Sequence, residues 1–264
     1  MDKSELLAEQ YADASNLSTR GEFNERYTVK DRHPHEWVRK QVSLPTDARV
    51  LDIGCGPGTF WTVNNDQIPP EWEVVLGDFS RDMVTKARNR VTNGDLSPHI
   101  TVADAERLPF DANSFDAILA LQMLYHLPDI ENGLQGLREV LRPDGCLYAS
   151  AGSPHNAELL FEMMSTVVDG SVETISNGFT NENGYELLNQ YFDHVEQRIF
   201  ENEIRVEDPD AVVSYALSLP LDDPALEPFD PEDAEELRAV VAEYIDRHGE
   251  IRWQKDYPLF IAKP

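Results

Sequence analysis

The chain has 264 residues, enough for one sizeable α/β domain with further elements attached to it. Its 49 Asp and Glu residues against 22 Lys and Arg residues give a formal net charge of −27, an excess that repels nucleic-acid phosphates and anionic membranes at low salt. No apolar run approaches the roughly 18–20 residues of a membrane span, and no basic, apolar leader begins the sequence, so we expect a cytoplasmic protein without a membrane partner.

The acidic residues are scattered along the whole chain instead of forming a tail. This distribution is similar to that of halophilic proteins. In molar salt the Debye length is about 3 Å, so the charge then argues less strongly against RNA as a partner. The two cysteines, Cys55 and Cys146, offer neither a disulfide framework nor a metal-ligand spacing, and we expect no metal.

Residues 1–47 form the first of three expected regions, an N-terminal helical segment. It is polar with scattered aromatic side chains, and residues 34–42 predict a short helix with Pro34 in its first turn. We expect this segment to pack beside the entrance of the core. Trp37 is one of several side chains in it that would anchor the segment or reach a bound ligand.

Residues 48–153 alternate between strand and helix patterns, which predicts βαβ units and a parallel sheet. The expected strands lie near residues 49–53, 72–77, 98–103, 115–120 and 145–151, and the expected helices near 57–65, 80–92 and 130–141. The fold class is therefore α/β, a doubly wound Rossmann-like sheet. In such sheets ligands bind at the carboxyl ends of the strands.

Residues 154–264 are expected to complete the sheet and to carry a helical cap. Strand patterns near 195–206 and 257–262 predict a mostly parallel sheet with an antiparallel final strand. The insertion at 208–249 has two Asp-Pro helix starts and an apolar stripe that includes Leu237, Val241 and Tyr244. The stripe would either pack toward the strand ends as a lid over an acceptor or cover one face of a sheet.

The stretch 50–59 joins a short apolar strand to three glycines at alternate positions, Gly54, Gly56 and Gly58. Glycine lets a loop turn sharply and lets a ligand approach bare backbone. The dinucleotide fingerprint G-x-G-x-x-G would need a third glycine where Thr59 stands. The acid two residues before the first glycine, Asp52, favours a ligand that carries an amine over a pyrophosphate.

At these residues, and at motifs that follow in order, the chain resembles the class I S-adenosylmethionine (SAM) dependent methyltransferases of the methyltransferase type 11-like group. The resemblance rests on residues 50–59, 76–80, 102–110, 114–120 and 139–145, and it covers roughly residues 48–153. A single glycine loop is weak support for membership of a family, whereas several motifs in the family's order are specific support. The resemblance implies SAM as the cofactor.

The resemblance gives roles to residues at the strand ends. Asp52 would hold the methionine ammonium beside Gly54, Gly56 and Gly58, or else it would orient the loop as a structural acid. Asp78, about 20 residues past the loop, would accept both ribose hydroxyls, or else it would cap the next helix.

Further residues would surround the other end of the cofactor. Asp104 and the backbone of Ala105 would meet the adenine, although Asp is also common in turns after strands. Phe79 and Met83 would pack around the ribose and adenine.

After the fourth strand the family places residues beside the reactive methyl group. Gln122 would contact the cofactor there. His126 would act as a general base for an acceptor with a proton to lose, or it would be part of the scaffold. Methyl transfer is an in-line displacement at an activated carbon, so orientation and exclusion of water supply most of the acceleration and a base is optional.

The sequence thus predicts a SAM-dependent methyltransferase whose acceptor is unidentified, with a small molecule favoured and RNA possible. Two other functions stay open: a SAM-binding protein without catalysis, and an NAD(P)-dependent oxidoreductase on a related fold. Thr59 and the motifs around Asp104 and Asp116 disfavour the oxidoreductase.

Overall fold

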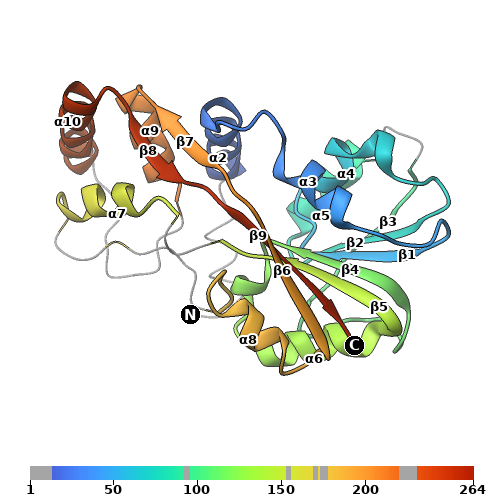
Figure 1. Cartoon of the computed structure of the whole chain (residues 1–264). Helices are drawn as coiled ribbons and strands as arrows, with labels where there is room; N and C mark the ends of the chain where they lie inside the picture. The colour runs from blue at the N-terminus through green and yellow to red at the C-terminus, as the bar shows by residue number, and fades with distance from the viewer. Residues whose placement is uncertain (1–13, 92–95, 153–155, 169–171, 173–177, 220–230) are drawn as a thin grey trace. The chain divides into compact units, whose positions relative to one another are not determined.

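The computed structural model describes residues 14–91, 96–152, 156–168, 172, 178–219 and 231–264. The chain folds into two compact units, each assembled from three separate stretches (Figure 1). The large-sheet unit comprises residues 32–153, 177–200 and 257–264, and the small-sheet unit comprises residues 1–31, 154–176 and 201–256. These boundaries differ from the contiguous divisions expected near residues 47 and 154.

The large-sheet unit is organised around a seven-stranded sheet with the order β3-β2-β1-β4-β5-β9-β6. Its strands are β1 Arg49–Ile53, β2 Glu73–Asp78, β3 His99–Val102, β4 Phe115–Leu121, β5 Leu141–Ser150, β6 His194–Phe200 and β9 Tyr257–Lys263. Neighbours from β3 to β5 pair in parallel, whereas β9 runs antiparallel to both β5 and β6. The predicted doubly wound sheet with an antiparallel final strand is confirmed.

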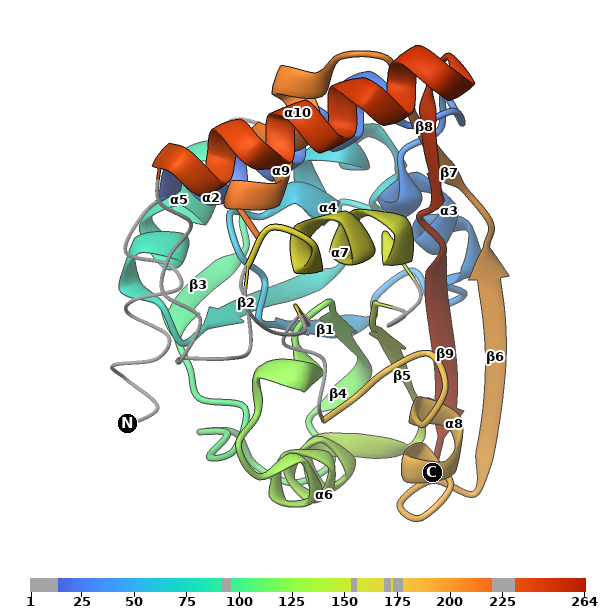
Figure 2. The same ribbon diagram turned by 90° about the vertical axis from the view of Figure 1, so that its left-hand side faces the viewer.

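Helices cover both faces of this sheet (Figures 1 and 2). On one side lie α3 Pro34–Gln41, α4 Thr59–Val63 and α5 Arg81–Val91, and on the other lie α6 Ile130–Val140 and α8 Gly184–Leu188; the short 3-10 helices are Asn65–Gln67 and Leu124–His126. Along β5, Cys146 and Tyr148 join the core under the first group, and Leu147 and Ala149 join the core under the second. This strict alternation fixes which strand-end side chains share a face.

The helix after the glycine loop begins later than predicted. Its first residue is Thr59 rather than position 57, because Gly58 is the N-cap residue and has a left-handed backbone with φ of +75°. Pro57 therefore lies in the loop. Ser80 caps α5 as expected, since its Oγ accepts a hydrogen bond from Met83 N at 3.4 Å.

The small-sheet unit has its own apolar core. A two-stranded antiparallel sheet, β7 Glu203–Val206 and β8 Ile251–Gln254, packs with helices α2 Ala14–Tyr27, α7 Glu158–Ser165, α9 Pro209–Leu217 and α10 Pro231–His248. Phe23 stacks on Tyr215 at 4.3 Å and lies parallel to Trp253 at 5.8 Å between ring centroids. The helix α2 lies within the segment 1–47 that was expected to be helical, but its bounds were not predicted, because its polar sequence shows little amphipathic pattern.

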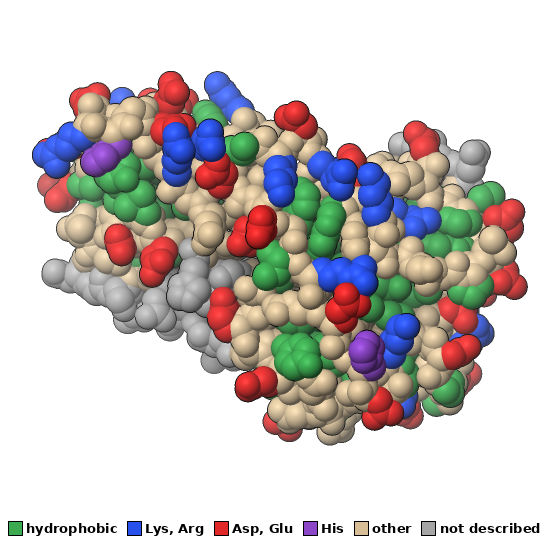
Figure 3. Space-filling model, viewed as in Figure 1, with side chains coloured by type: hydrophobic (Ala, Val, Ile, Leu, Met, Phe, Trp, Pro, Cys, Tyr) green, Lys and Arg blue, Asp and Glu red, His purple; other side chains and the backbone are tan. Residues whose placement is uncertain are grey.

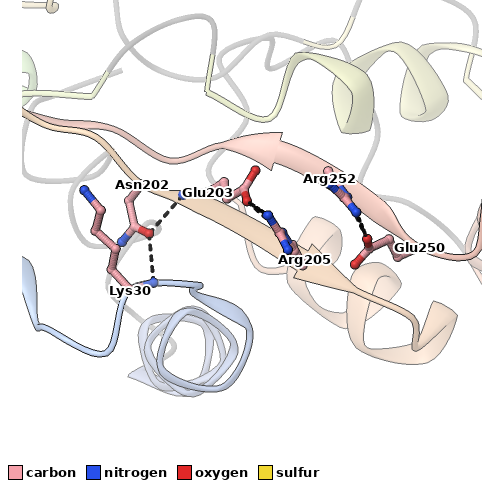
Figure 4. A network of polar contacts seen from close by, with 6 residues as sticks. All are labelled: Lys30, Asn202, Glu203, Arg205, Glu250 and Arg252. Atoms are coloured by element: carbon pink, nitrogen blue, oxygen red, sulfur yellow. Dashed lines mark hydrogen bonds and ion pairs between the residues drawn. The ribbon is translucent and has the colours of Figure 1, made fainter.

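The single strand expected at residues 195–206 is instead two strands in two different sheets. The break lies at Asn202, whose Oδ1 accepts hydrogen bonds from Glu203 N at 2.9 Å and Lys30 N at 3.3 Å (Figure 4). Asn202 N donates to Asp256 Oδ1 at 2.9 Å. A side chain that bonds the neighbouring backbone in this way competes with a continuous strand ladder.

The insertion at 208–249 is part of the small-sheet unit. Asp208 caps α9 as predicted, with its side chain accepting from Asp210 N, whereas the second expected cap, Asp230, lies outside the described residues. In α10, Leu237 and Val241 are fully buried in the core of this unit, with Tyr244 partly buried against it. The two buried side chains of the stripe therefore stabilise their own unit and are not available to line an acceptor pocket.

Charged side chains of both signs are interspersed on the molecular surface, as the face drawn in Figure 3 shows. On the outer face of the small sheet, Arg205 pairs with Glu203 and Arg252 pairs with Glu250 (Figure 4). Exposed pairs of this kind contribute little stability individually. Among the described helices, none is long and apolar enough to cross a membrane.

Candidate cofactor site

The glycine loop lies where β1 ends, at the carboxyl edge of the parallel strands. Gly54 N and Cys55 N both donate to Gly77 O, at 2.8 and 3.1 Å, so the loop is bonded to the end of β2. Gly54, Gly56 and Gly58 have φ values of +70°, +55° and +75°. Residues with a Cβ atom rarely adopt a backbone conformation with positive φ, which explains why these alternating positions are glycine.

Space also restricts the first glycine. A Cβ atom on Gly54 would lie 2.6 Å from Met123 Cβ and 2.7 Å from Met123 Cγ, whereas a Cβ on Gly56 would meet no atom of the described residues within 4 Å. Gly56 thus leaves open space beside its backbone. The loop packs at Gly54 against Met123, which follows β4, and is open at Gly56.

Asp78 connects this loop to the strand beside it. Its Oδ2 accepts from Gly56 N at 2.8 Å, and its Oδ1 accepts from Ser80 N at 2.8 Å. Burial raises the pKa of Asp78, and the two backbone hydrogen bonds partly oppose that rise. Each carboxylate oxygen accepts more than one hydrogen bond, so the group retains acceptor capacity for two further hydroxyls.

Asp52 is buried, with 3% of its surface exposed, and its Oδ2 accepts from Trp61 Nε1 at 2.7 Å. Burial raises its pKa to about 7, against the hydrogen bond from Trp61 and with a smaller contribution from the charge of Asp78. Among the described residues, Asp52 Oδ1 has no hydrogen-bond partner. Asp52 therefore both fixes the helix that follows the loop and retains an oxygen for a cation.

The residues predicted around the adenine lie next to Asp78 in the sheet, because Ala103 N donates to Asp78 O at 3.0 Å. Asp104 Oδ1 accepts from Glu106 N at 3.1 Å, which makes Asp104 part of a turn as well as a candidate ligand. Ala105 is buried, and Met83 is fully buried. Phe79, by contrast, has 39% of its surface exposed directly after Asp78.

Gln122 follows β4 with a left-handed backbone, φ +57°. Its N–H donates to Ser150 O and Oγ at 3.1 and 3.0 Å, and its Nε2 donates to Ala151 O at 2.7 Å. Ser150 Oγ in turn contacts the hydroxyl of Tyr257 at 2.9 Å. The ends of β4, β5 and β9 thus share one hydrogen-bonded cluster.

Sequence reasoning did not identify Ser150 or Tyr257, nor His35 at the start of α3. The His35 ring lies edge-on to Phe60 at 5.9 Å and to Tyr257 at 6.0 Å. Only the pairing of β5 with β9 brings residues 150 and 257 together, and no local pattern signals this. His126 lies in the 3-10 helix after β4, with its ring 4.3 Å from that of Tyr125.

This arrangement fits an adenosine-containing ligand with a charged amino-acid end. Bare backbone at Gly56, unused acceptor capacity on Asp78 and a buried acid at Asp52 occur together at one strand edge. The hydrogen bond between Gly56 and Asp78 shows that the loop and the carboxylate are held in a fixed relation. These features match what ribose hydroxyls and an ammonium require.

Comparison with known proteins agrees with this geometry. Residues 50–145 match a family model described as a methyltransferase domain. Residues 50–145 are a class I methyltransferase domain. The class is SAM-dependent, as the motifs implied, and the match spans the loop, Asp78 and both residues of the adenine motif.

Two curated relatives share this domain. The methyltransferase GfsG of Streptomyces halstedii is 30% identical over 146 residues, 52% of this chain and 47% of that protein. The ubiquinone/menaquinone biosynthesis C-methyltransferase UbiE of Nitrosospira multiformis is 32% identical over 114 residues, 42% of this chain and 47% of that protein. The chain thus spans about half the length of the curated relatives it matches.

A solved structure shows that the fold extends beyond the methyltransferase domain. The YcgJ protein from Bacillus subtilis aligns with a TM-score of 0.60 over 88% of this chain and 98% of that chain, at 16% sequence identity. At this identity the likeness concerns the fold alone. The parts of this chain that follow the methyltransferase domain therefore have structural counterparts in another protein.

Proposed function

We propose that this protein transfers a methyl group from SAM to a small-molecule acceptor. The observation that carries the proposal is the bond from Gly56 N to Asp78 Oδ2, which holds a bare-backbone loop and a carboxylate at adjacent strand ends. An NAD(P) site would instead need a third glycine at position 59, where threonine begins α4.

Within this proposal each candidate residue has a defined role. Asp78 accepts the two ribose hydroxyls, and Asp52 receives the methionine ammonium on Oδ1. The backbone at Gly54, Gly56 and Gly58 allows close approach.

The remaining candidates surround the adenine and the methyl group. Asp104 and Ala105 bind the adenine edge, and the exposed ring of Phe79 packs against adenine or ribose, while buried Met83 supports that wall from within the core. Gln122 contacts the cofactor from the end of β4.

SAM, when bound, supplies a methyl group made electrophilic by positive sulfur. The chain's own contribution is then to bind, to orient and to exclude water. Asp52 fixes the methionine end of the cofactor and Asp78 fixes its ribose, while the Gln122 turn lies after β4, the strand next to β1 on the side away from β2. His126 would serve as a base only for an acceptor that must lose a proton.

A small molecule is the favoured acceptor because the UbiE relative is, by its name, a C-methyltransferase of ubiquinone/menaquinone biosynthesis. RNA is the second candidate, and no described feature of this chain favours it over a small molecule. The net charge of −27 argues against an RNA acceptor at low salt.

The proposed function is tested by titrating the protein with SAM and with its product S-adenosylhomocysteine in a calorimeter, and then by incubating it with methyl-labelled SAM and a panel of quinol, phenol and amine acceptors. Binding of both ligands and labelling of one acceptor class is the expected result. Absence of SAM binding by the folded protein contradicts the proposal. Binding without labelling of any acceptor, RNA included, would indicate a SAM-binding protein without catalysis.

The affinity for S-adenosylhomocysteine is expected to fall as the pH is lowered from 8 to 6. Burial raises the pKa of Asp52 to about 7, and the ligand's ammonium prefers the ionised carboxylate, so protons compete with the ligand below that pH. The loss approaches about tenfold per pH unit well below the pKa. Asp52→Asn, which keeps an acceptor for Trp61, should bind more weakly and show a flat profile over this range. An unchanged slope in that variant would contradict the role of Asp52.

A further inference from the structure

The hydroxyl of Tyr257 accepts a hydrogen bond from Ser150, and its own O–H can donate another. Ser150 Oγ accepts from Gln122 N at 3.0 Å and from Gln122 Nε2 at 3.3 Å, which fills both of its lone pairs. Its single proton is therefore directed to Tyr257, whose oxygen lies 2.9 Å away. Since the phenol oxygen is the acceptor in that bond, its own O–H remains a donor.

The imidazole of His35 lies beside Tyr257. Its Nδ1 is buried and forms no hydrogen bond with any described residue, and its ring lies edge-on to the rings of Phe60 and Tyr257. Burial, assisted by the charge of His33, lowers the pKa of His35 to about 3, so the imidazole is neutral and one nitrogen carries a proton. Leaving a buried polar atom unbonded costs roughly 1–3 kcal/mol, which a ligand can recover.

These two groups lie on the same side of the sheet as Asp52. Asp52 Oδ2 accepts from Trp61 Nε1, the Trp61 ring lies 5.2 Å from that of Phe60, and the side chain of Tyr257 packs against the same apolar cluster. One strand edge therefore presents an acid with an unused oxygen, a phenol O–H that donates, and a neutral imidazole whose Nδ1 donates in the Nδ1–H tautomer. An α-amino acid carries an ammonium and a carboxylate on one carbon, so its two charges need neighbouring partners of these kinds.

We propose that Tyr257, positioned by Ser150 and Gln122, donates a hydrogen bond to the α-carboxylate of the cofactor's methionine end, with His35 Nδ1–H as the second donor. The inference rests on the proposed function, because it assigns the amino-acid end of the same cofactor. It adds a subsite built from α3, β5 and β9, outside residues 50–145. A carboxylate fits this pair better than an amine does, because both groups donate.

The inference is tested by comparing SAM with decarboxylated SAM, which retains the amine and the adenosine but lacks the carboxylate. Binding is measured by calorimetry without any acceptor, so that turnover does not contribute. Tyr257→Phe and His35→Phe are each expected to weaken SAM binding about tenfold and to leave decarboxylated SAM unchanged. Ser150→Ala should produce a smaller loss of the same selectivity, because it removes the group that positions Tyr257.

The matched control is Tyr148→Phe, which removes a hydroxyl from β5 that contacts Ser43 N at 3.3 Å instead of this cluster. It should bind both ligands as the unaltered protein does. Equal weakening of both ligands by Tyr257→Phe, or no weakening by either Tyr257→Phe or Ser150→Ala, would overturn the inference. Failure of the unaltered protein to bind SAM at all is a different result, because it would contradict the proposed function itself.

Discussion

Asp78→Ala is expected to weaken the binding of SAM and S-adenosylhomocysteine by roughly 2–3 kcal/mol, about 30- to 150-fold in Kd. The substitution removes a charged acceptor for two ribose hydroxyls. It also frees Gly56 N and Ser80 N, which lie 2.8 Å from the two carboxylate oxygens, so the loop loses its link to the end of β2. Calorimetry measures the loss directly.

Asp82→Ala is the matched control for this prediction. Asp82 lies four residues further along the chain, and its side chain is 60% exposed in an ion pair with Lys86. Removing it changes the net charge by the same amount without touching the loop, so affinity should stay within experimental error. A folded Asp78→Ala protein with the affinity of the unaltered protein would show that the ribose lies elsewhere.

Gly54→Ala is expected to destabilise the fold by about 2–5 kcal/mol and to abolish cofactor binding. A left-handed backbone costs a residue with a Cβ atom about 1–2 kcal/mol, and overpacking typically adds 1–3 kcal/mol. Here the new Cβ would lie 2.6 Å from Met123 Cβ, which is fixed to its own backbone and cannot rotate away. Urea unfolding of the two proteins gives the difference.

Gly56→Ala separates backbone strain from steric overlap. Its φ of +55° imposes a similar strain, but an added Cβ would meet no atom of the described residues within 4 Å. This variant should lose only about 1 kcal/mol of stability. Equal destabilisation by the two substitutions would mean that Met123 moves to accommodate the added methyl group, and would contradict the rigid packing of the loop against it.

The sequence by itself determined the sheet and the location of the candidate site. Strand and helix patterns between residues 49 and 150 are local and periodic, so the elements lie within a few residues of the expected ranges, whereas the order of the strands in the sheet comes from the structure. The glycine loop is also predictable from the sequence, because a left-handed backbone restricts the residue type at the position itself. Asp52 and Asp78 are recognisable for a different reason, because each is an acidic residue at the end of an apolar strand.

Tertiary structure alone decided which distant side chains join these acids. Ser150 and Tyr257 meet because β9 pairs antiparallel with β5, and Trp61 reaches Asp52 because α4 folds back onto β1. The expected strand at 195–206 divides because Asn202 bonds the neighbouring backbone, which sends residues 203–206 into a second sheet with 251–254. Such long-range pairing depends on the whole chain's packing, whereas a local pattern records only the conformation of its own residues.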